Sequence, residues 1–324
     1  MIQDIHVWER LAQFIGAAAA MGFGAMGAAI GEGYVASEAT LAISRTPEST
    51  GDIFKTMLVG QAVAESASIF ALVVAMLLLF TPAPTGNLTV AFSLLAAGLC
   101  MGLGAIGSGV GSGFPGAQAC KGIGRQPASM KRLTTTMLVG SAVCQTPAIF
   151  ALVTSLILLF FNFSTHPFSP TWAAILGASL SMGLGAIGSG IGEGLVAGAG
   201  CEGVARNPSE AGPITNIMLL GLAVTETTAI YSLLISFILI FKEFPSTTLL
   251  APSAALLSAG ICMGLGAFGP GVGEGFAGHN AVKWIARNED ARGTLVRTML
   301  VGQAVAESTG IYSLVVALVL IFVI

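Results

Sequence analysis

The chain consists of four copies of one pattern, and each copy contains two long apolar segments. Equivalent positions in successive copies are offset by 80, 81 and 81 residues. The repeat is plainest in four glycine-rich stretches: GAMGAAIGEG from Gly24, GAIGSGVGSG from Gly104, GAIGSGIGEG from Gly185 and GAFGPGVGEG from Gly266. Because a repeat of this length is one supersecondary unit, the sequence predicts a tandem array of four helical hairpins.

Each apolar segment exceeds the roughly 20 residues that a helix needs to cross a bilayer. Only 9% of the 324 residues are charged, whereas soluble domains carry about 25%. This composition excludes an ordinary soluble enzyme, and the net charge of −3 argues against a nucleic-acid partner. We expect an all-α membrane protein with eight transmembrane helices. Their expected spans are residues 11–44, 51–80, 88–124, 128–161, 170–205, 210–241, 250–286 and 292–323.

The four hairpins are expected at residues 1–83, 84–165, 166–246 and 247–324. Eleven of the 13 Lys and Arg residues lie in or beside the short connections within hairpins. The positive-inside rule therefore predicts that these connections are cytoplasmic and that both termini lie on the opposite side. The first residues, MIQDIHVWERLAQ, lack the basic region of a signal peptide, so we expect the whole chain to be mature.

Small residues occupy alternating positions along the first helix of each copy. They let membrane helices approach closely, and their spread around the helix predicts packing on more than one side, as in an inner ring of helices. Ordinary GxxxG dimerisation is the alternative, whereas a phosphate-binding loop would need a preceding strand. Pro47, Pro127 and Pro208 are expected to end this helix in three copies, and Glu289 stands there in the fourth.

Six glutamates lie inside apolar segments, where a charge costs from about 3 to more than 10 kcal/mol. They form three pairs with a constant spacing of 33 residues: Glu32 with Glu65, Glu193 with Glu226, and Glu274 with Glu307. This spacing can place both side chains of a pair at similar depth on adjacent helices. A proton-sharing contact that only closes the hairpin is one interpretation. A functional ion site is favoured, because Gln or Ser would serve the structural purpose at lower cost.

Oxygen donors recur beside the second glutamate of each pair. A hydroxyl residue follows it directly, and Phe70, Tyr231 or Tyr312 lies five positions after it. Carboxylate, hydroxyl and carbonyl oxygens are hard ligands that suit a small hard cation. A Ser or Thr more often bonds back to its own helix, but recurrence beside a buried glutamate favours a ligand role.

The second copy lacks both carboxylates. Ser112 and Gln145 stand in their places, and Pro147 is expected to interrupt the helix two residues later. The joint loss indicates that the two carboxylates of a pair work as one unit. The second hairpin is accordingly expected to be a scaffold with a degenerate site.

These features resemble the rotor-ring c subunit (proteolipid) of sodium-type rotary F-type ATP synthases. GQAVAESTGIYSLVVALVLIF (Gly302–Phe322) resembles the ion-carrying helix, and GPGVGEGFAGHNAVKWIARN (Gly269–Asn288) resembles the first helix, although Glu289 replaces the usual proline. The resemblance covers essentially the whole chain. It implies a non-catalytic, ion-translocating subunit of a rotary ATPase in a prokaryotic plasma membrane. The implied partners are further copies in a homo-oligomeric ring, a stator a subunit, central-stalk subunits at the Arg-x-Pro loops, and lipid.

The resemblance also implies roles for individual residues. The ion-carrying carboxylate matches Glu65, Glu226 and Glu307, and the backbone-carbonyl ligand matches Val63, Val224 and Val305. The hydroxyl ligand matches Ser66, Thr227 and Ser308, and the tyrosine that orients the carboxylate matches Tyr231 and Tyr312. Phe70 departs from this pattern, which predicts a weaker first site. A first-helix position that is often Gln in sodium-type rings matches Glu32, Glu193 and Glu274.

With two carboxylates, each pair is expected to hold one proton and one net negative charge. Na⁺ would neutralise the pair, and a second proton would do so at low Na⁺ concentration. The expected cargo is therefore Na⁺ with competing H⁺, and no organic cofactor is expected. Three pairs on four hairpins would lower the number of ions moved per turn, which favours a rotor suited to ATP-driven export.

Two other interpretations remain open. The proteolipid (K/c) subunit of V/A-type rotary ATPases also contains fused hairpins, although the Arg-Gln-Pro and Arg-Asn-Pro loops favour the F-type. A repeat-built ion channel or secondary transporter is more remote, because such folds usually use inverted repeats or broken helices. An enzyme is disfavoured, since the sequence shows no nucleophile–base set or metal triad.

Overall fold

The computed structural model describes residues 2–82 and 87–323, and these residues form an all-helical protein. The first hairpin consists of α1 (Ile2–Arg45) and α2 (Thr50–Phe80), and the second of α3 (Leu88–Arg125), α4 (Met130–Cys144) and α5 (Thr146–Phe160). The third consists of α6 (Phe168–Arg206) and α7 (Ala211–Phe241), and the fourth of α8 (Leu250–Ile285) and α9 (Arg292–Phe322). The expected boundary between residues 83 and 84 lies outside the described residues.

The helices are long and apolar enough to cross a membrane eight times, as predicted. Most of their ends lie within a few residues of the expected ones. The exception is α1, which begins at Ile2 rather than near residue 11. Its polar first turns remain helical because they have partners: Glu9 and Gln13 are buried, and Gln13 donates a 3.0 Å hydrogen bond to the carbonyl of Thr81.

The prolines act where the sequence predicts. Pro47, Pro127 and Pro208 each begin a short 3₁₀ turn just after the first helix of their hairpin (Pro47–Ser49, Pro127–Ser129 and Pro208–Glu210). Because a residue before proline disfavours the α conformation, each helix ends there. Pro147 separates α4 from α5, with Gln145 between them.

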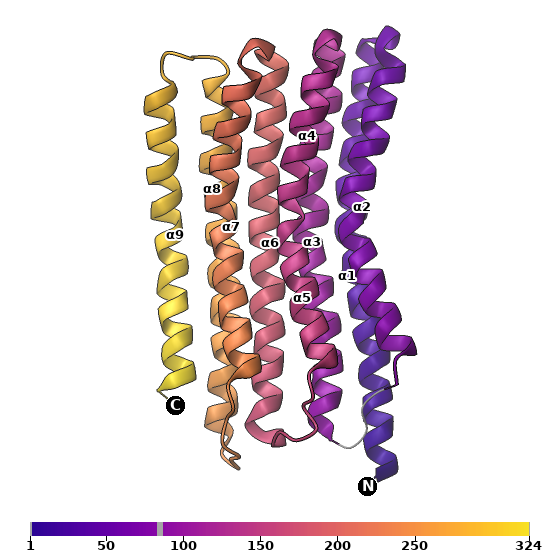
Figure 1. Cartoon of the computed structure of the whole chain (residues 1–324), viewed down its shortest axis with the longest axis vertical. Coiled ribbons are helices and arrows are strands. Elements are labelled where there is room, and N and C mark those ends of the chain that lie inside the picture. Colours follow the sequence, from indigo (N-terminus) through magenta and orange to yellow (C-terminus); the bar gives the residue numbers. More distant parts are fainter. Residues whose placement is uncertain (1, 83–86, 324) are drawn as a thin grey trace.

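The four hairpins stand side by side in chain order, from α1 and α2 at one edge to α8 and α9 at the other (Figure 1). The connections within hairpins lie at one end of the molecule, and both termini lie at the opposite end. The most extensive contacts between hairpins join α1 to α3, α3 to α6, and α6 to α8. These four helices form one closely packed layer, and α2, α4 with α5, α7 and α9 form a second, looser layer.

Glycine makes the close layer possible. A Cβ atom at Gly107 of α3 would collide with the backbone of Ala186 and Ile187 in α6, and one at Gly111 would collide with the carbonyl oxygen of Gly190. Without side chains at these positions, backbones approach closely and gain van der Waals contact, which drives helix association in membranes. Gly109 and Gly113 of α3 meet the backbone of α1 in the same way, which confirms that this first helix packs on more than one side.

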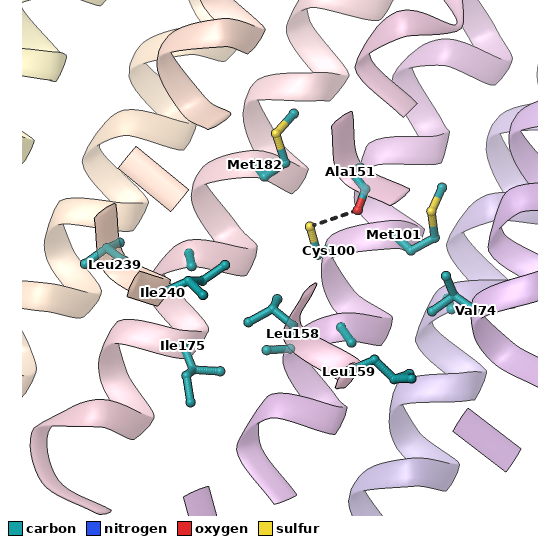
Figure 2. Close-up of a cluster of buried hydrophobic side chains, with 14 of the residues drawn as sticks. Val74, Cys100, Met101, Ala151, Leu158, Leu159, Ile175, Met182, Leu239 and Ile240 are labelled. Atoms are coloured by element: carbon teal, nitrogen blue, oxygen red, sulfur yellow. Dashed lines mark hydrogen bonds between the residues drawn. The ribbon is translucent and has the colours of Figure 1, made fainter. Parts of the chain in front are cut away.

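Two apolar clusters stabilise the halves of the molecule on either side of the central glutamates. In Figure 2, side chains of the cluster nearer the termini come from α2, α3, α5, α6 and α7. Met101, Leu158, Ile175 and Met182 are fully buried there, and the thiol of Cys100 donates a 3.6 Å hydrogen bond to the carbonyl of Ala151. Along α6, buried Glu193 lies between Ala186 of this cluster and Val196 of the other.

Candidate ion-binding site

Three glutamates lie at the centres of three helices of equal length. The helices α2, α7 and α9 each have 31 residues, and Glu65, Glu226 and Glu307 are their central residues. In the second hairpin, Gln145 takes this place between two helices of 15 residues. A 31-residue helix is about 46 Å long, so its centre lies near the middle of a hydrocarbon layer about 30 Å thick.

The glutamates of the first helices face the interior. Glu193 and Glu274 are fully buried, whereas Glu32 is half-buried. One carboxylate oxygen of Glu193 accepts a 2.9 Å hydrogen bond from Ser189. Among the described residues, its other oxygen and both oxygens of Glu274 have no hydrogen-bond partner. Because burying an unpaired carboxylate is costly, these oxygens are suited to take up a proton or a cation.

The carboxylate of Glu307 receives two hydrogen bonds from the neighbouring hairpin. Thr227 donates one at 2.8 Å and the phenol of Tyr231 donates one at 2.5 Å, both to Oε1. The same hydroxyl lies 2.8 Å from the carbonyl of Val224, so its single proton is shared between these two acceptors. Carboxylate, hydroxyl and carbonyl oxygens therefore meet at the contact between α7 and α9, beside the buried Glu274 on α8.

The degenerate pair, in contrast, makes a direct hydrogen bond across its hairpin. Gln145 donates one hydrogen bond to Ser112 at 2.5 Å and another to the carbonyl of Val63 at 3.1 Å. Two residues that are 33 positions apart thus meet across their hairpin. The carbonyl comes from the preceding hairpin, as the hydroxyl and phenol do at Glu307.

The oxygen atoms that meet at Gln145 and at Glu307 come from two successive hairpins, not from one copy of the sequence repeat. Gln145 donates to a carbonyl of the preceding hairpin. Glu307 accepts hydrogen bonds from a hydroxyl and a phenol of the preceding hairpin rather than from Ser308 and Tyr312 of its own copy. The carbonyl of Val63 thus accepts a hydrogen bond from Gln145 of the second hairpin. Ser66 and Ser308 bond back to the carbonyls of Val63 and Val305, at 2.6 and 2.7 Å, which is the ordinary behaviour of a helical serine.

Comparison with known proteins agrees with this architecture. The family model for the C subunit of ATP synthase matches the chain four times, at residues 15–78, 95–158, 176–239 and 257–320. The chain belongs to this family. One relative is the ATP synthase c subunit of Petrotoga mobilis, which is 57% identical over 68 residues, 21% of this chain and 71% of the relative.

Another relative aligns with most of this chain. The A-type ATP synthase K subunit of Methanocaldococcus jannaschii is 30% identical over 230 residues, which cover 71% of this chain and 96% of the relative. The ATP synthase c subunit of Thermotoga maritima is 50% identical over 68 residues, 21% of this chain and 80% of the relative. The chain is therefore a rotary-ATPase proteolipid of the c/K type and a multi-pass membrane protein.

In this proteolipid, no cluster of three or more His, Cys, Asp or Glu side chains is placed to hold a metal ion among the described residues. A cation at the central layer would instead be held by a carboxylate pair together with hydroxyl and carbonyl oxygens. All three kinds of oxygen suit a small hard cation. The salt bridges that tie hairpins together, such as Lys121 to Glu38 and Lys283 to Glu202, lie towards the connections within hairpins.

Two polar residues near the glutamates were not predicted. Gln303 is fully buried and donates hydrogen bonds to the carbonyls of Gly221 and Glu274, at 3.0 and 3.3 Å. Ser189 supports Glu193. Each lies four positions, about one helical turn, before a glutamate of the site, and this spacing is the signal that could have identified both.

Proposed function

We propose that this proteolipid carries Na⁺, in competition with H⁺, on the glutamate pairs Glu32–Glu65, Glu193–Glu226 and Glu274–Glu307. Ion movement through the pairs is coupled to rotation of a ring and thereby to ATP synthesis or hydrolysis. The observation that supports this most strongly is the Glu307 carboxylate, which lies at the helix centre with a hydroxyl and a phenol donating to it. Unpaired oxygens of Glu274 supply further ligands.

The net charge of a glutamate pair determines whether the pair can face lipid. Two carboxylates that share one proton carry one net negative charge, which is expensive in lipid. Binding Na⁺ or a second proton makes the pair neutral, so that its hairpin can face lipid. Releasing the ion restores the charge and confines the pair to a polar channel, which we assign to the stator a subunit. This asymmetry turns ion flow into rotation, and ATP hydrolysis reverses it.

The second hairpin takes part in rotation without carrying an ion. Gln145 is neutral, and its amide nitrogen already contacts two acceptors, Ser112 and the carbonyl of Val63. An N–H donor therefore occupies the position that a cation would need. This hairpin can enter lipid in the same state throughout a turn.

The two layers favour assembly into a ring. The helices α1, α3, α6 and α8 are closely packed, whereas the second layer makes fewer contacts between hairpins. When the first helices of a row of hairpins lie closer together than the second helices, the row curves towards the first helices. These helices then form the inner wall of the ring. The basic connections would face the cytoplasm and the central-stalk subunits, and both termini would lie on the opposite side.

Two types of rotary ATPase are candidates for the complex that contains this proteolipid. The 57% identity to a c subunit and the Arg-x-Pro connections favour an F-type complex. The 30% identity to an A-type K subunit over 96% of that protein favours an A-type complex, because both chains contain fused hairpins. Purification of the complex through this proteolipid and mass spectrometry of its catalytic subunits will distinguish the two.

Labelling with dicyclohexylcarbodiimide tests the proposed cargo. The reagent modifies a protonated carboxyl group, so Na⁺ binding should slow labelling of Glu65, Glu226 and Glu307 in the intact complex at neutral pH. K⁺ at equal ionic strength is the control, and the Glu307→Gln variant identifies the peptide that carries that site. Equal labelling in Na⁺ and K⁺ would show that sodium is not the cargo.

A further inference from the structure

Lys242 is a basic residue at the end of the molecule that carries both termini. It follows α7, in the connection of residues 242–249 between the third and fourth hairpins (Figure 1). Eleven of the 13 Lys and Arg residues lie in or beside the connections at the other end, and only Arg10 shares the end of Lys242. In the proposed orientation, the positive-inside rule disfavours a basic residue here. An anionic partner would compensate for this placement.

The preceding connection shows what the repeat places at the same position. Phe161, 81 positions before Lys242, packs against Phe163 and Phe241, with ring centroids 4.9 and 5.7 Å apart. Phe163 is only 1% exposed. The second and third hairpins are therefore joined by an apolar cluster of rings around a buried phenylalanine.

Lys242 replaces Phe161 in the next copy, whereas the other two rings are retained as Phe244 and Phe322. Its ammonium nitrogen lies 5.6 Å from the centroid of the Phe244 ring and 5.0 Å from that of Phe322. Aromatic faces attract a cation, but they offer no oxygen acceptor to its three N–H donors. The adjacent Glu243 is exposed, and within residues 2–82 and 87–323 no salt bridge or side-chain hydrogen bond holds the ammonium. The charge of Lys242 is thus held in place by two rings without being neutralised.

A cavity of about 440 Å³ lies beside Lys242, between the third and fourth hairpins. Its volume is in the range of small-ligand sites, roughly 300–1,000 Å³. Ser246 and Thr247 of the connection also line it, and Leu256, Ile321 and three prolines contribute apolar surface. The lining therefore combines a cation and hydroxyl groups with hydrocarbon, which suits a ligand that has an anionic group and an apolar part.

The connection that lines the cavity is tied to the helices on either side. The backbone N–H of Thr247 donates to the carbonyl of Ser169 in α6 at 3.3 Å. The hydroxyl of Thr247 accepts the N–H of Leu249 at 3.1 Å, just before α8 begins. The hydroxyl of Ser169 lies 3.2 Å from that of Ser253 in α8. The cavity is therefore built by the folded hairpin pair and not by a loop that lies apart from it.

The position of the cavity favours a membrane lipid as the source of the anion. The cavity lies where α7 and α9 end and α8 begins, which is near the boundary between hydrocarbon and headgroups. A free phosphate ion would gain nothing from the apolar surface, whereas the glycerol and acyl groups of a phospholipid would bury apolar area against it. Basic pockets between transmembrane helices are suited to anionic headgroups for the same reason.

We propose that this cavity binds the phosphate group of an anionic phospholipid. The ammonium of Lys242 is the main donor and the hydroxyl of Ser246 is a second, while Phe244 and Phe322 hold the ammonium in place. The bound lipid turns with the rotor as part of it. This site depends neither on which ion the glutamates carry nor on the number of chains in the ring.

Photocrosslinking in the intact, reconstituted ring tests this site. The probe is a phosphatidylglycerol with a diazirine on an acyl carbon near the glycerol, diluted into phosphatidylcholine, and mass spectrometry maps its adducts. We expect an adduct between residues 243 and 256 that unlabelled phosphatidylglycerol displaces and that inorganic phosphate does not.

Variants at the two basic residues of this end show whether the binding is specific. Lys242→Met should raise the probe concentration that gives half of the maximal adduct about tenfold, because a hydrogen bond to a charged group contributes about 1.5 kcal/mol. Lys242→Arg should retain the adduct. Arg10→Met is the matched control, since it removes the other positive charge of this end and should leave the adduct unchanged.

Three results would overturn the proposal. Equal loss of the adduct in Lys242→Met and Arg10→Met would show only a general attraction of anionic lipid to surface charge. Displacement by inorganic phosphate would identify a free anion rather than a lipid as the ligand, and an undiminished adduct in Lys242→Met would remove this residue from the site. Carbodiimide labelling of Glu307 at the unmodified rate shows that a variant ring is folded, and Lys242→Gln takes the place of Lys242→Met if the methionine variant fails this check.

Discussion

At the scale of single residues, the second hairpin differs from the other three at two positions, where Ser112 and Gln145 replace the paired glutamates. The Gln145 amide donates to the carbonyl of Val63 and to Ser112. A glutamate at position 145 would place its carboxylate oxygens, which only accept hydrogen bonds, against the carbonyl oxygen of Val63. A proton or a cation would then be needed between the carboxylate and the carbonyl. The amide N–H groups of Gln145 therefore have partners without an ion, although its Oε1 atom is buried without a hydrogen-bond partner among the described residues.

Thr227 provides a test of the hydroxyl ligand. Thr227→Val keeps the shape of the side chain but removes the 2.8 Å hydrogen bond to Glu307. We expect the Na⁺ concentration that half-protects Glu307 from the carbodiimide to rise about fivefold, because roughly 1 kcal/mol of interaction is lost. Thr227→Ser keeps the hydroxyl and should retain protection. Equal behaviour of the two variants would remove Thr227 from the site.

Residue types in the sequence predict that carboxylates and hydroxyls meet, but not which ones. Glu65 and Ser66 are neighbours in the chain, yet successive residues of a helix point in directions about 100° apart. The partner of a donor is determined by how hairpins pack against each other. This is why Tyr231 donates to Glu307 of the next copy, a pairing that no spacing within one copy indicates.

At the scale of elements, the spans of the helices could be predicted because apolar length and proline position both depend on local sequence. The start of α1 could not, since its polar residues are stabilised by partners such as the carbonyl of Thr81, 68 positions away from Gln13. The break at Gln145 follows from Pro147, which lacks the N–H of a regular helix.

Close helix packing predicts a large effect of a single methyl group. Gly111→Ala would place a Cβ atom against the carbonyl oxygen of Gly190, between two backbones that have no flexible side chain to move. We expect a loss of about 1–3 kcal/mol in stability, measured as a lower thermal midpoint of the purified protein in detergent. Gly212→Ala is the matched control, because nothing lies within 4 Å of its added Cβ atom. Equal midpoints would show that the α3–α6 contact is looser than described.

At the scale of the whole molecule, fusion fixes the order of hairpins with and without carboxylates. A ring of separate hairpins could have the same residue at every position, but this chain contains one Gln145 hairpin for every three hairpins with glutamates, whatever the number of chains in the ring. The ratio of glutamate pairs to hairpins is therefore a property of the sequence, and ring size changes only their total number.

The double variant Ser112→Glu with Gln145→Glu should create a fourth site in each chain. The two side chains already meet across the hairpin, and the preceding hairpin offers the carbonyl of Val63 and the hydroxyl of Ser66, although Phe70 stands where Tyr231 donates to Glu307. Ions per turn should rise by a factor of four thirds, whatever the ring size. The ion-motive force at which ATP synthesis and hydrolysis balance should then fall to about three quarters, because each ion contributes about 2.3 kcal/mol per 100 mV.

The balance point can be measured with the reconstituted complex in liposomes at a fixed ATP/ADP ratio. Gln145→Met is the matched control, since it removes the amide hydrogen bonds at similar volume without adding a carboxylate, and its balance point should not move. An unchanged balance point in the double variant, with the introduced carboxyl group at position 145 reactive to the carbodiimide, would contradict the idea that the second hairpin sets the ion-to-ATP ratio. A shift in the Gln145→Met control would attribute the effect to altered packing at this hairpin rather than to a fourth ion.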